Sequence, residues 1–449
     1  LRSGASLRLC FNSSGKLEYI YMPSKTASVS DDNVLVAKNK PTGSNNPFAS
    51  LSGGKTPAQI YKNGIPAELS DLRQYDVGTY DKSSDTLFVS DLKLSGLYEN
   101  AYPNAAAPST VTVMGAELTV LPSAQADLAA FKVGDKVTLL LTTTGQVAGA
   151  VSPDVAKSNA VGVAEVKGTT ATIELLDGIL TLEGQTTYSG AAAAKLNGCL
   201  VTVSSYKRDY LTLSKVNGKG ASTALNLTTN RMGTKELSAG ARFFEQVGNG
   251  RLVEIDRSDI TITSIPANKI TYVGYDWAGR VDKLVLNDVT GDRYDYGIIH
   301  YQPAGYQETP GNPDGNGEYK NGEISVTNGS FPKGMPPYVV GSVDGAKTNR
   351  MGGVAGSLDQ LDGKNRMAAF MPLNEAKGIR RAQFDTDAML LTTNSMVIPI
   401  SDKVECYNKT TGDWFKPGED GDHKAALNLA LAFSDDITVY YDRSPEEGG

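Results

Sequence analysis

The sequence predicts an all-β chain of several small barrel-like or sandwich-like modules in series, with few short helices. Three observations predict this. Apolar and polar residues alternate with a period of two in many short runs, 47 glycines are spread over the whole length, and long amphipathic helical patterns are nearly absent. Alternation places one face of each run on a core, and glycine permits the tight turns between runs.

One hairpin pattern recurs along the chain, with Gly15, Gly145, Gly250 and Gly279 as its reference glycines. Each glycine is followed by a long polar residue and then by an aliphatic one, and an apolar residue stands six positions before it. The residue four positions before is also apolar, except at Gln246. The pattern indicates a strand, a tight turn in which glycine takes positive φ, and a second strand.

A second element precedes several of these hairpins. It consists of a short helical or looped turn, a leucine that plugs a core, a corner bearing Gly or Asp, and a strand. Leu72, Leu128 and Leu237 are its leucines, and a related turn at 434–436 leads to a strand at 437–442. Units of about 30–45 residues are too small to bury a core alone, so neighbours must stack or close into barrels.

Short helices are expected at three places, 126–131, 191–195 and 424–433. A chain of 449 residues is also too long for one core. Pro, Gly and Asn crowd together in one segment, which indicates a loop-rich insertion or joint there. The expected division is β-modules at 1–110, 111–218 and 219–302, the loop-rich segment at 303–378, and a C-terminal β-module with one short helix at 379–449.

Composition excludes several functional classes. The net charge of −7 and the lack of a Lys/Arg-rich stripe predict no nucleic-acid partner. No apolar run approaches the ~18 residues of a membrane span. The cysteines Cys10, Cys199 and Cys406 are far apart and unpaired in pattern, so we interpret them as small buried apolar residues. The chain has only two histidines, His300 and His423, so we expect neither a histidine metal site nor a histidine general base.

Catalytic motifs are not found. The run Gly53-Gly54-Lys55-Thr56 resembles a phosphate loop, but Ala49 stands where that motif requires a glycine, so we interpret the run as an exposed turn. Neither a nucleophile elbow nor a zinc-protease motif is present. Adjacent carboxylates such as those at 435–436 are interpreted as turn residues rather than a glycosidase pair. We therefore expect the chain not to be an enzyme.

One stretch matches the spacing of a calcium loop, with oxygen-bearing side chains at the expected positions and a glycine at the sixth. Its candidate ligands are Asn312, Asp314, Asn316, Glu318 and Glu323. The first position is Asn rather than Asp, and no flanking helices are evident, so a polar hairpin loop is the competing interpretation. Calcium is the single cofactor that the sequence raises.

Aromatic residues leave a sugar-binding surface open as an alternative. Tyr294, Tyr296 and Tyr301 cluster in the sequence, and the two tryptophans are Trp277 in a hairpin turn and Trp414 after a glycine. Such rings can stack on sugars. Tyrosine is also a favoured strand residue with an apolar body and a polar tip, so strand packing is the other interpretation.

Three stretches resemble a known family. These are LPSAQADLAAFKVGDKVTLLLTTTGQVAGA at 121–150, DLRQYDV at 71–77, and the C-terminal stretches YNKTTGDWF at 407–415, ALAFSDD at 430–436 and TVYYD at 438–442. They are similar to modules of the large bacterial S-layer-type surface proteins that carry SLH domains. In that family the SLH domains bind cell-wall polymer, and the remaining modules form the outward-facing layer.

The resemblance implies a location and a structural role, and no site residues. No SLH domain is recognisable here, so we assign binding of cell-wall polymer to domains outside this chain, which we expect to be an excerpt of a longer secreted polypeptide. The expected function is a non-catalytic, extracellular, cell-wall-associated structural protein that self-associates and contacts other cell-surface proteins. A surface adhesin or glycan-binding module is the alternative, and a polysaccharide-acting enzyme is the third class.

Overall fold

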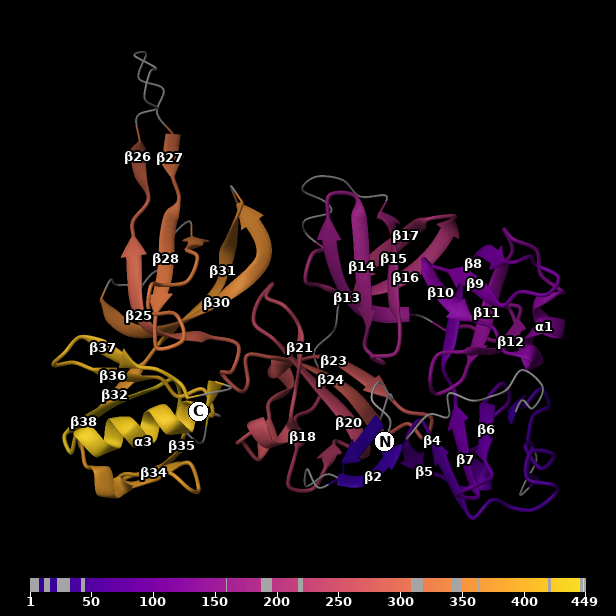
Figure 1. The fold of residues 1–449 in the computed structure, drawn as a ribbon, viewed down its shortest axis with the longest axis horizontal. Coiled ribbons are helices and arrows are strands. Elements are labelled where there is room, and N and C mark those ends of the chain that lie inside the picture. Colours follow the sequence, from indigo (N-terminus) through magenta and orange to yellow (C-terminus); the bar gives the residue numbers. More distant parts are fainter. Residues whose placement is uncertain are drawn as a thin grey trace. The chain divides into compact units, whose positions relative to one another are not determined.

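The computed structural model describes residues 8–11, 17–21, 33–41, 45–158, 160–186, 196–216, 221–307, 318–340, 349–361, 363–418, 421–444 and 447. The predicted all-β class is confirmed: strands dominate, and the part of the chain described contains two α-helices, α1 (Pro122–Leu128) and α3 (His423–Phe433) (Figure 1). Residue contacts divide the chain into two units. Unit 1 is Leu1–Lys219, Thr234–Arg242 and Val273–Leu284, and unit 2 is Gly220–Gly233, Phe243–Tyr272 and Val285–Gly449.

Unit 1 opens with an antiparallel hairpin and continues with a five-stranded sheet. The hairpin is β1 (Arg8–Phe11) and β2 (Leu17–Tyr21). The sheet has the order β3-β6-β7-β4-β5. Its strands are β3 (Val34–Val36), β4 (Gln59–Lys62), β5 (Ile65–Pro66), β6 (Val77–Asp81) and β7 (Thr86–Ser90). β4 runs parallel to β7, and the 3₁₀ turn η1 (Leu69–Asp71) connects β5 to β6. Phe48 and Leu72 are buried in its core.

A second five-stranded sheet follows, in the order β10-β9-β8-β11-β12. Its strands are β8 (Lys93–Tyr102), β9 (Thr110–Val113), β10 (Ala116–Thr119), β11 (Lys136–Leu141) and β12 (Val147–Val151). The strand β11 is almost continuously apolar because it is covered on both faces. Helix α1 begins at a proline, which suits a first helical turn, and buries Ala124 and Leu128 against this sheet.

A closed five-stranded barrel completes the continuous part of unit 1. Its strands are β13 (Ala160–Lys167), β14 (Thr170–Leu175), β15 (Thr181–Thr186), β16 (Leu200–Lys207) and β17 (Tyr210–Lys215). The first strand pairs antiparallel with the second and the fourth, and the third pairs parallel with the fifth, which closes the barrel. One apolar cluster runs through the barrel and the preceding sheet, so these two modules share a core.

Seven strands form a further sheet, in the order β22-β18-β19-β20-β24-β23 with β21 paired to β20. They are β18 (Leu225–Asn226), β19 (Arg231–Met232), β20 (Lys235–Gln246), β21 (Val253–Ile255), β22 (Ser264–Ile265), β23 (Ile270–Tyr275) and β24 (Val281–Asn287). Two 3₁₀ turns, η2 (Arg257–Asp259) and η3 (Ala267–Lys269), flank β22. β20, β23 and β24 each contribute residues to both units.

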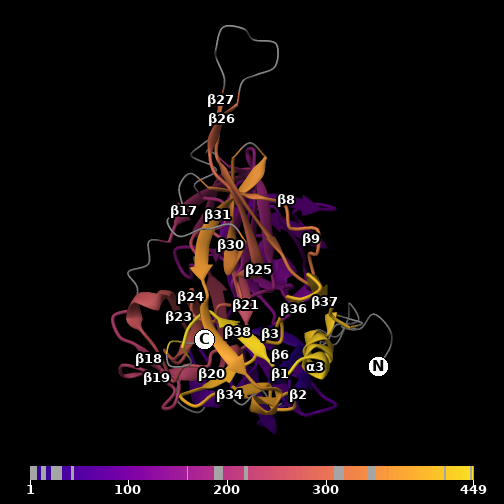
Figure 2. The same ribbon diagram turned by 90° about the vertical axis from the view of Figure 1, so that its left-hand side faces the viewer.

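Unit 2 contains a second closed barrel with the connectivity of the first. Its strands are β25 (Asp295–Gln302), β28 (Gly322–Thr327), β29 (Tyr338–Val340), β30 (Arg350–Leu361) and β31 (Lys364–Pro372). Here too the first strand pairs with the second and the fourth, and the third runs parallel to the fifth. β26 (Gly305–Gln307) and β27 (Glu318–Lys320) continue the β25–β28 pair as a narrow ribbon that projects from the barrel (Figures 1 and 2).

The C-terminal part of unit 2 is built from short hairpins and α3. Its strands are β32 (Asn374–Ile379), β33 (Phe384–Asp385), β34 (Leu390–Thr392), β35 (Val397–Pro399), β36 (Cys406–Asn408), β37 (Asp413–Phe415) and β38 (Ile437–Tyr441), with η4 (Arg381–Gln383) between the first two. β38 pairs antiparallel with β32. Asp422 caps α3, because its side chain accepts the Ala425 N–H at 3.2 Å.

The hairpin prediction is confirmed with one correction. Gly145 and Gly279 take positive φ of 82° and 75° in the β11–β12 and β23–β24 hairpins. In the β20–β21 hairpin the turn lies where it was predicted, because the Gly250 N–H donates to the Val247 carbonyl at 2.8 Å as the Gly145 N–H does to the Thr142 carbonyl, but the residue with positive φ is Gly248 (54°) rather than Gly250. Gly15 lies outside the described residues, although β1 and β2 on either side of it pair as expected.

Among the predictions of helices and buried leucines, some are confirmed and one is wrong. Helices are found at α1 and α3, and 191–195 lies outside the described residues. Leu72 and Leu128 are buried plugs, but Leu237 lies within strand β20 rather than after a helical turn, because its neighbours pair in the sheet. The described residues of 303–378 include strands β28 to β31 of the second barrel, whose long-range pairing forms despite the local Pro and Gly content, and the division at 303 and 378 stays a prediction. The remaining module boundaries stay predictions.

No helix among the described residues is long and apolar enough to cross a membrane.

Candidate functional site

A fully buried ion pair joins the end of β4 to the corner before β6 in the five-stranded sheet β3-β6-β7-β4-β5 of unit 1. Period-two alternation along β4 turns Ile60 and Lys62 inward together, so a lysine occupies an interior position. The Lys62 side chain is 0% exposed and its Nζ lies 2.6 Å from Oδ2 of Asp76, whose side chain is 1% exposed. Lys62 Nζ also donates to the Asp71 carbonyl oxygen at 3.1 Å.

Asp76 reaches this position through the corner that follows η1. Leu72 plugs the core, Tyr75 takes a positive φ of 66°, and Asp76 Oδ2 accepts the Arg73 N–H at 2.7 Å before β6 begins. The corner after α1 repeats this bond, since Asp135 Oδ2 accepts the Lys132 N–H at 2.8 Å. Asp135, however, is exposed, whereas Asp76 is directed at a buried lysine.

Burial controls the protonation of the groups around this pair. Desolvation raises the pKa of the Asp76 carboxyl; Lys62 opposes the rise and Asp91 adds to it. Desolvation also lowers the pKa of the Lys93 ammonium, against the attraction of Asp91 and Asp76. The pKa of the Asp282 carboxyl is raised, again by burial first, with Lys283 opposing. Burial therefore favours the neutral forms of the Asp76 and Asp282 carboxyl groups and of the Lys93 amine.

Trp277 covers the buried ammonium. It lies in the β23–β24 turn, and Lys62 Nζ stands 5.4 Å from the centre of its ring. The Arg280 guanidinium carbon is 4.9 Å from the same ring, and Arg280 Nε donates to Asp276 Oδ2 at 2.8 Å. Both cations gain from the electron-rich ring face, most strongly where water is excluded. The turn thus seals the Lys62–Asp76 pair from one side.

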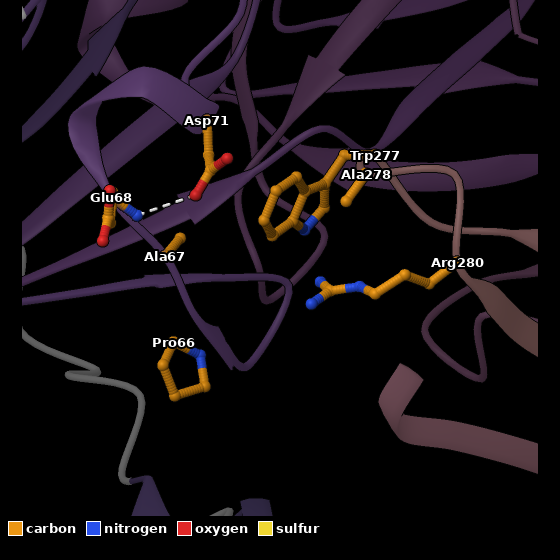
Figure 3. Close-up of a pocket in the computed structure, with 7 residues that line it drawn as sticks. All are labelled: Pro66, Ala67, Glu68, Asp71, Trp277, Ala278 and Arg280. Carbon is orange, nitrogen blue, oxygen red and sulfur yellow. Dashed lines mark hydrogen bonds between the residues drawn. The ribbon is translucent and has the colours of Figure 1, made fainter. Parts of the chain in front are cut away.

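A shallow pocket of ≈ 620 Å³ opens beside Trp277 (Figure 3). It is lined by Pro66, Ala67, Glu68, Asp71, Trp277, Ala278 and Arg280. One wall, from β5 and η1, carries two carboxylates, and the other, from the β23–β24 turn, carries the indole and the guanidinium (Figure 3). Asp71 Oδ2 is held by the Glu68 N–H at 2.9 Å. The pocket suits a small ligand with hydroxyl groups and one apolar face.

Three buried polar atoms at this site have no hydrogen-bond partner within the described part of the chain. They are Asp76 Oδ1, Trp277 Nε1 and Arg280 Nη2. Buried polar atoms are normally paired, and these three belong to the ion pair and to the pocket beside it.

The predicted calcium ligands are not brought together as a set within the described residues. Asn312, Asp314 and Asn316 lie outside those residues, and Glu318 belongs to β27, where Gln307 is its partner across the ribbon. Glu323 lies on β28, and its carboxylate forms an ion pair with Lys364 of β31. The calcium hypothesis therefore stays a prediction.

The tyrosine cluster packs inside unit 2 rather than lining a platform. The Tyr294 and Tyr296 rings are 5.9 Å apart, and burial raises the pKa of both hydroxyls. Tyr301 packs against the core of the second barrel. Trp414 lies 4.9 Å from the ring of Tyr407 in the β36–β37 hairpin. Among the sequence candidates for sugar stacking, Trp277 lines the pocket beside Arg280.

Two further predictions can be placed. Gly53 and Gly54 lie in a run of turns, with positive φ of 66° and 85°, as expected for an exposed turn and not a phosphate loop. Cys199 is buried and Cys406 is half-buried, neither of them in a disulfide, and the Cys10 side chain lies outside the description. Burial raises the pKa of the Cys406 thiol to about 12.

Sequence reasoning missed the Lys62–Asp76 pair. The available signal was the phase of β4, in which Lys62 falls on the same face as Ile60. It also found the corner carrying Asp76 without inferring that this carboxylate meets a lysine from another strand.

Comparisons of the chain with protein-family models, with curated proteins and with solved structures give no significant match.

Proposed function

We propose that this chain is part of a non-catalytic bacterial cell-surface protein of the S-layer type, which acts through protein–protein assembly in the extracellular layer. The observation that carries the proposal is modular repetition. The two closed barrels, β13–β17 and β25 with β28–β31, share one connectivity although the chain between them forms other sheets. Serial modules that share cores with their neighbours extend a chain and present strand edges for association.

Repetition extends to the atomic detail of the turns. In the β11–β12 hairpin the Thr142 N–H donates to the Gln146 carbonyl at 2.9 Å and the Gly145 N–H to the Thr142 carbonyl at 3.0 Å. In the β23–β24 hairpin Asp276 and Gly279 make the corresponding bonds at 2.8 and 2.9 Å. The side chain of the first residue of each turn, Thr142 or Asp276, also accepts hydrogen bonds from two backbone N–H groups. Recurrent structural bonds of this kind support a structural role.

Helix α3 offers a surface for contacts between copies. Leu429 and Phe433 lie one helical turn apart and are 49% and 73% exposed, and the Phe433 ring lies 6.4 Å from that of Phe415. Adjacent exposed apolar side chains are a common feature of interaction surfaces. We propose that a second copy of the chain covers them in the assembled layer.

Electron microscopy of the purified chain at rising concentration, with calcium and then with chelator, tests the assembly. Ordered sheets or filaments are expected, and the Leu429→Ser/Phe433→Ser variant should need a higher concentration to form them. Val155→Ser, at an exposed valine of unit 1 (57%), is the matched control and should assemble like the unaltered chain. Separate monomers at every concentration would contradict the proposal, and dissolution by chelator would support the calcium loop at 312–323.

The Trp277 pocket favours a second function, binding of glycans by a surface adhesin. Two carboxylates opposite an indole and a guanidinium match a sugar, whose hydroxyls both donate and accept while its C–H face contacts a ring. Glycan-array binding that Trp277→Ala or Glu68→Gln abolishes, and that Trp414→Ala leaves intact, would place this function first. Binding that is unaffected by all three variants would place the glycan site elsewhere, and no binding to any glycan would remove this alternative.

A further inference from the structure

We propose that Lys62 and Asp76 condense into an intramolecular amide, an isopeptide bond between Lys62 Nζ and Asp76 Cγ. The folded module would then contain a covalent cross-link between β4 and the corner that precedes β6. Nζ and Oδ2 are already 2.6 Å apart, and both side chains are within 1% of complete burial. Two groups that react slowly in water are thus held in contact, where proximity replaces a bimolecular encounter.

The surroundings hold the nucleophile and the acid in fixed positions. Lys62 Nζ is fixed by the Asp71 carbonyl at 3.1 Å, and Asp76 Oδ2 by the Arg73 N–H at 2.7 Å. Asp76 Oδ1 accepts no hydrogen bond within the described residues, so it is the oxygen that can depart. The Trp277 ring above the ammonium excludes water from that side.

No other lysine ion pair among the described residues meets these conditions. The lysine side chains in those pairs are 27% or more exposed. The Lys38–Asp127 pair, for example, has a separation of 2.5 Å, but Lys38 is 61% exposed and stays hydrated. Exposure keeps an ammonium charged and therefore not nucleophilic.

The reaction balances within the pair. A proton passes from the Lys62 ammonium to the Asp76 carboxylate, which leaves a neutral amine and a carboxylic acid. Burial favours the neutral acid, as the raised pKa of the Asp76 carboxyl indicates, and the charge of Asp91 adds to that rise. The amine nitrogen then forms a bond to Cγ, the Cγ–Oδ1 bond breaks, and the departing oxygen leaves as water with one proton from the acid and one from the amine. Neither oxidant nor co-reactant is needed.

The cross-link would join strands that hydrogen bonds do not join. In the order β3-β6-β7-β4-β5, β4 and β6 are separated by β7, so the amide would span the sheet between them. The residues are 14 apart in sequence, and the loop between them includes β5 and η1. A covalent closure of this kind would resist forced or thermal opening of a small module whose core is limited.

Mass spectrometry of the purified chain under denaturing conditions tests the proposal. The intact mass should be lower than the sequence mass by one water. After trypsin, cleavage at Lys62 should be lost while cleavage at Arg73 is retained, so that the peptide 56–73 remains joined to the peptide 74–82. Lys62→Arg and Asp76→Ala should each restore the full sequence mass. Lys38→Arg, in the exposed pair, is the matched control and should keep the water loss.

Any of the following results would overturn the proposal. The mass and the tryptic peptides of the unaltered chain are sufficient for this test even if a variant fails to fold. A full sequence mass together with free tryptic peptides ending at Lys62 would show that the pair is ionic only. A water loss that maps to a succinimide at an Asp-Gly step such as Asp177-Gly178 would assign the missing water to different chemistry. A water loss that survives Lys62→Arg would exclude Lys62 as the nucleophile.

Discussion

Gly115 provides the sharpest test of the shared core between the second sheet and the first barrel. It lies in the β9–β10 turn with a φ of 72°, beside Met114 at 51°. A Cβ built on Gly115 would lie 2.7 Å from the carbonyl carbon of Glu183 in β15, and closer still to its oxygen. The Gly115 N–H also donates to Oε2 of the buried Glu99 at 2.9 Å. Gly115→Ala must therefore push the turn away from the barrel.

The cost follows from two terms. An alanine with left-handed φ loses roughly 1 kcal/mol relative to glycine. Overpacking against an immobile backbone adds about 1–3 kcal/mol, so we expect a total loss of ~2–4 kcal/mol in the free energy of unfolding of this region. Gly168, in the β13–β14 turn, has a φ of 63° and no atom within 4 Å of its Cβ position. Gly168→Ala should therefore show only the loss of roughly 1 kcal/mol that comes from the left-handed φ.

Hydrogen exchange measured by mass spectrometry is the suitable assay, because a chain of several modules does not unfold in one step. Gly115→Ala should accelerate exchange in both β10 and β15, and Gly168→Ala should change it only near its own turn. Denaturant unfolding of the two variants supplies the free energies. Equal losses for the two variants, or faster exchange confined to β9 and β10 in Gly115→Ala, would refute the close packing of this turn on the barrel.

Three further predictions concern charged groups and a thiol. Arg443 donates to the Asp288 and Val289 carbonyls at 3.0 and 2.9 Å and pairs with the Asp288 carboxylate. Arg443→Ala should therefore lower the unfolding midpoint of unit 2 by an amount equivalent to ~2–3 kcal/mol. An unchanged midpoint would contradict a stabilising role of these contacts. Burial raises the pKa of Asp282, so its ionisation weakens the fold as pH rises through the folded-state pKa; Asp282→Asn should flatten the pH dependence of the unfolding midpoint on that side, and an unaltered profile would count against it. Cys406, with a pKa of about 12, should react with iodoacetamide at pH 8 only after denaturation, and rapid labelling of the native chain would disprove its burial.

Local sequence patterns were sufficient for the class of the fold and for many of its hairpins. Alternation and glycine placement predicted the β11–β12 and β23–β24 hairpins, because strand faces and positive-φ turns are decided by neighbouring residues. Helix α3 followed from its Ala- and Leu-rich composition in the same way. The plugs Leu72 and Leu128 were also found, because Leu72 directly follows η1 and Leu128 is the last residue of α1.

Long-range pairing was beyond such patterns. The local Pro, Gly and Asn content of 303–378 favours loops, whereas β29 becomes a strand through its pairing with β28 and β31. The prediction that Leu237 is a buried plug after a turn was wrong for the same reason, because sheet pairing places this residue within strand β20. The turn at Gly250 was predicted in the right place, but the positive φ falls on Gly248, because two glycines stand in this turn and either can adopt it.

The sequence by itself determined that this protein is a series of small β-modules, since side-chain periodicity and turn residues are properties of neighbouring positions. Only the tertiary structure decided that Lys62 meets Asp76 and that Trp277 closes over them. These residues come from a strand, a corner and a distant hairpin, and each alone has an ordinary surface interpretation. Their chemistry arises from burial, which depends on how the sheets pack and which no local pattern of residues encodes.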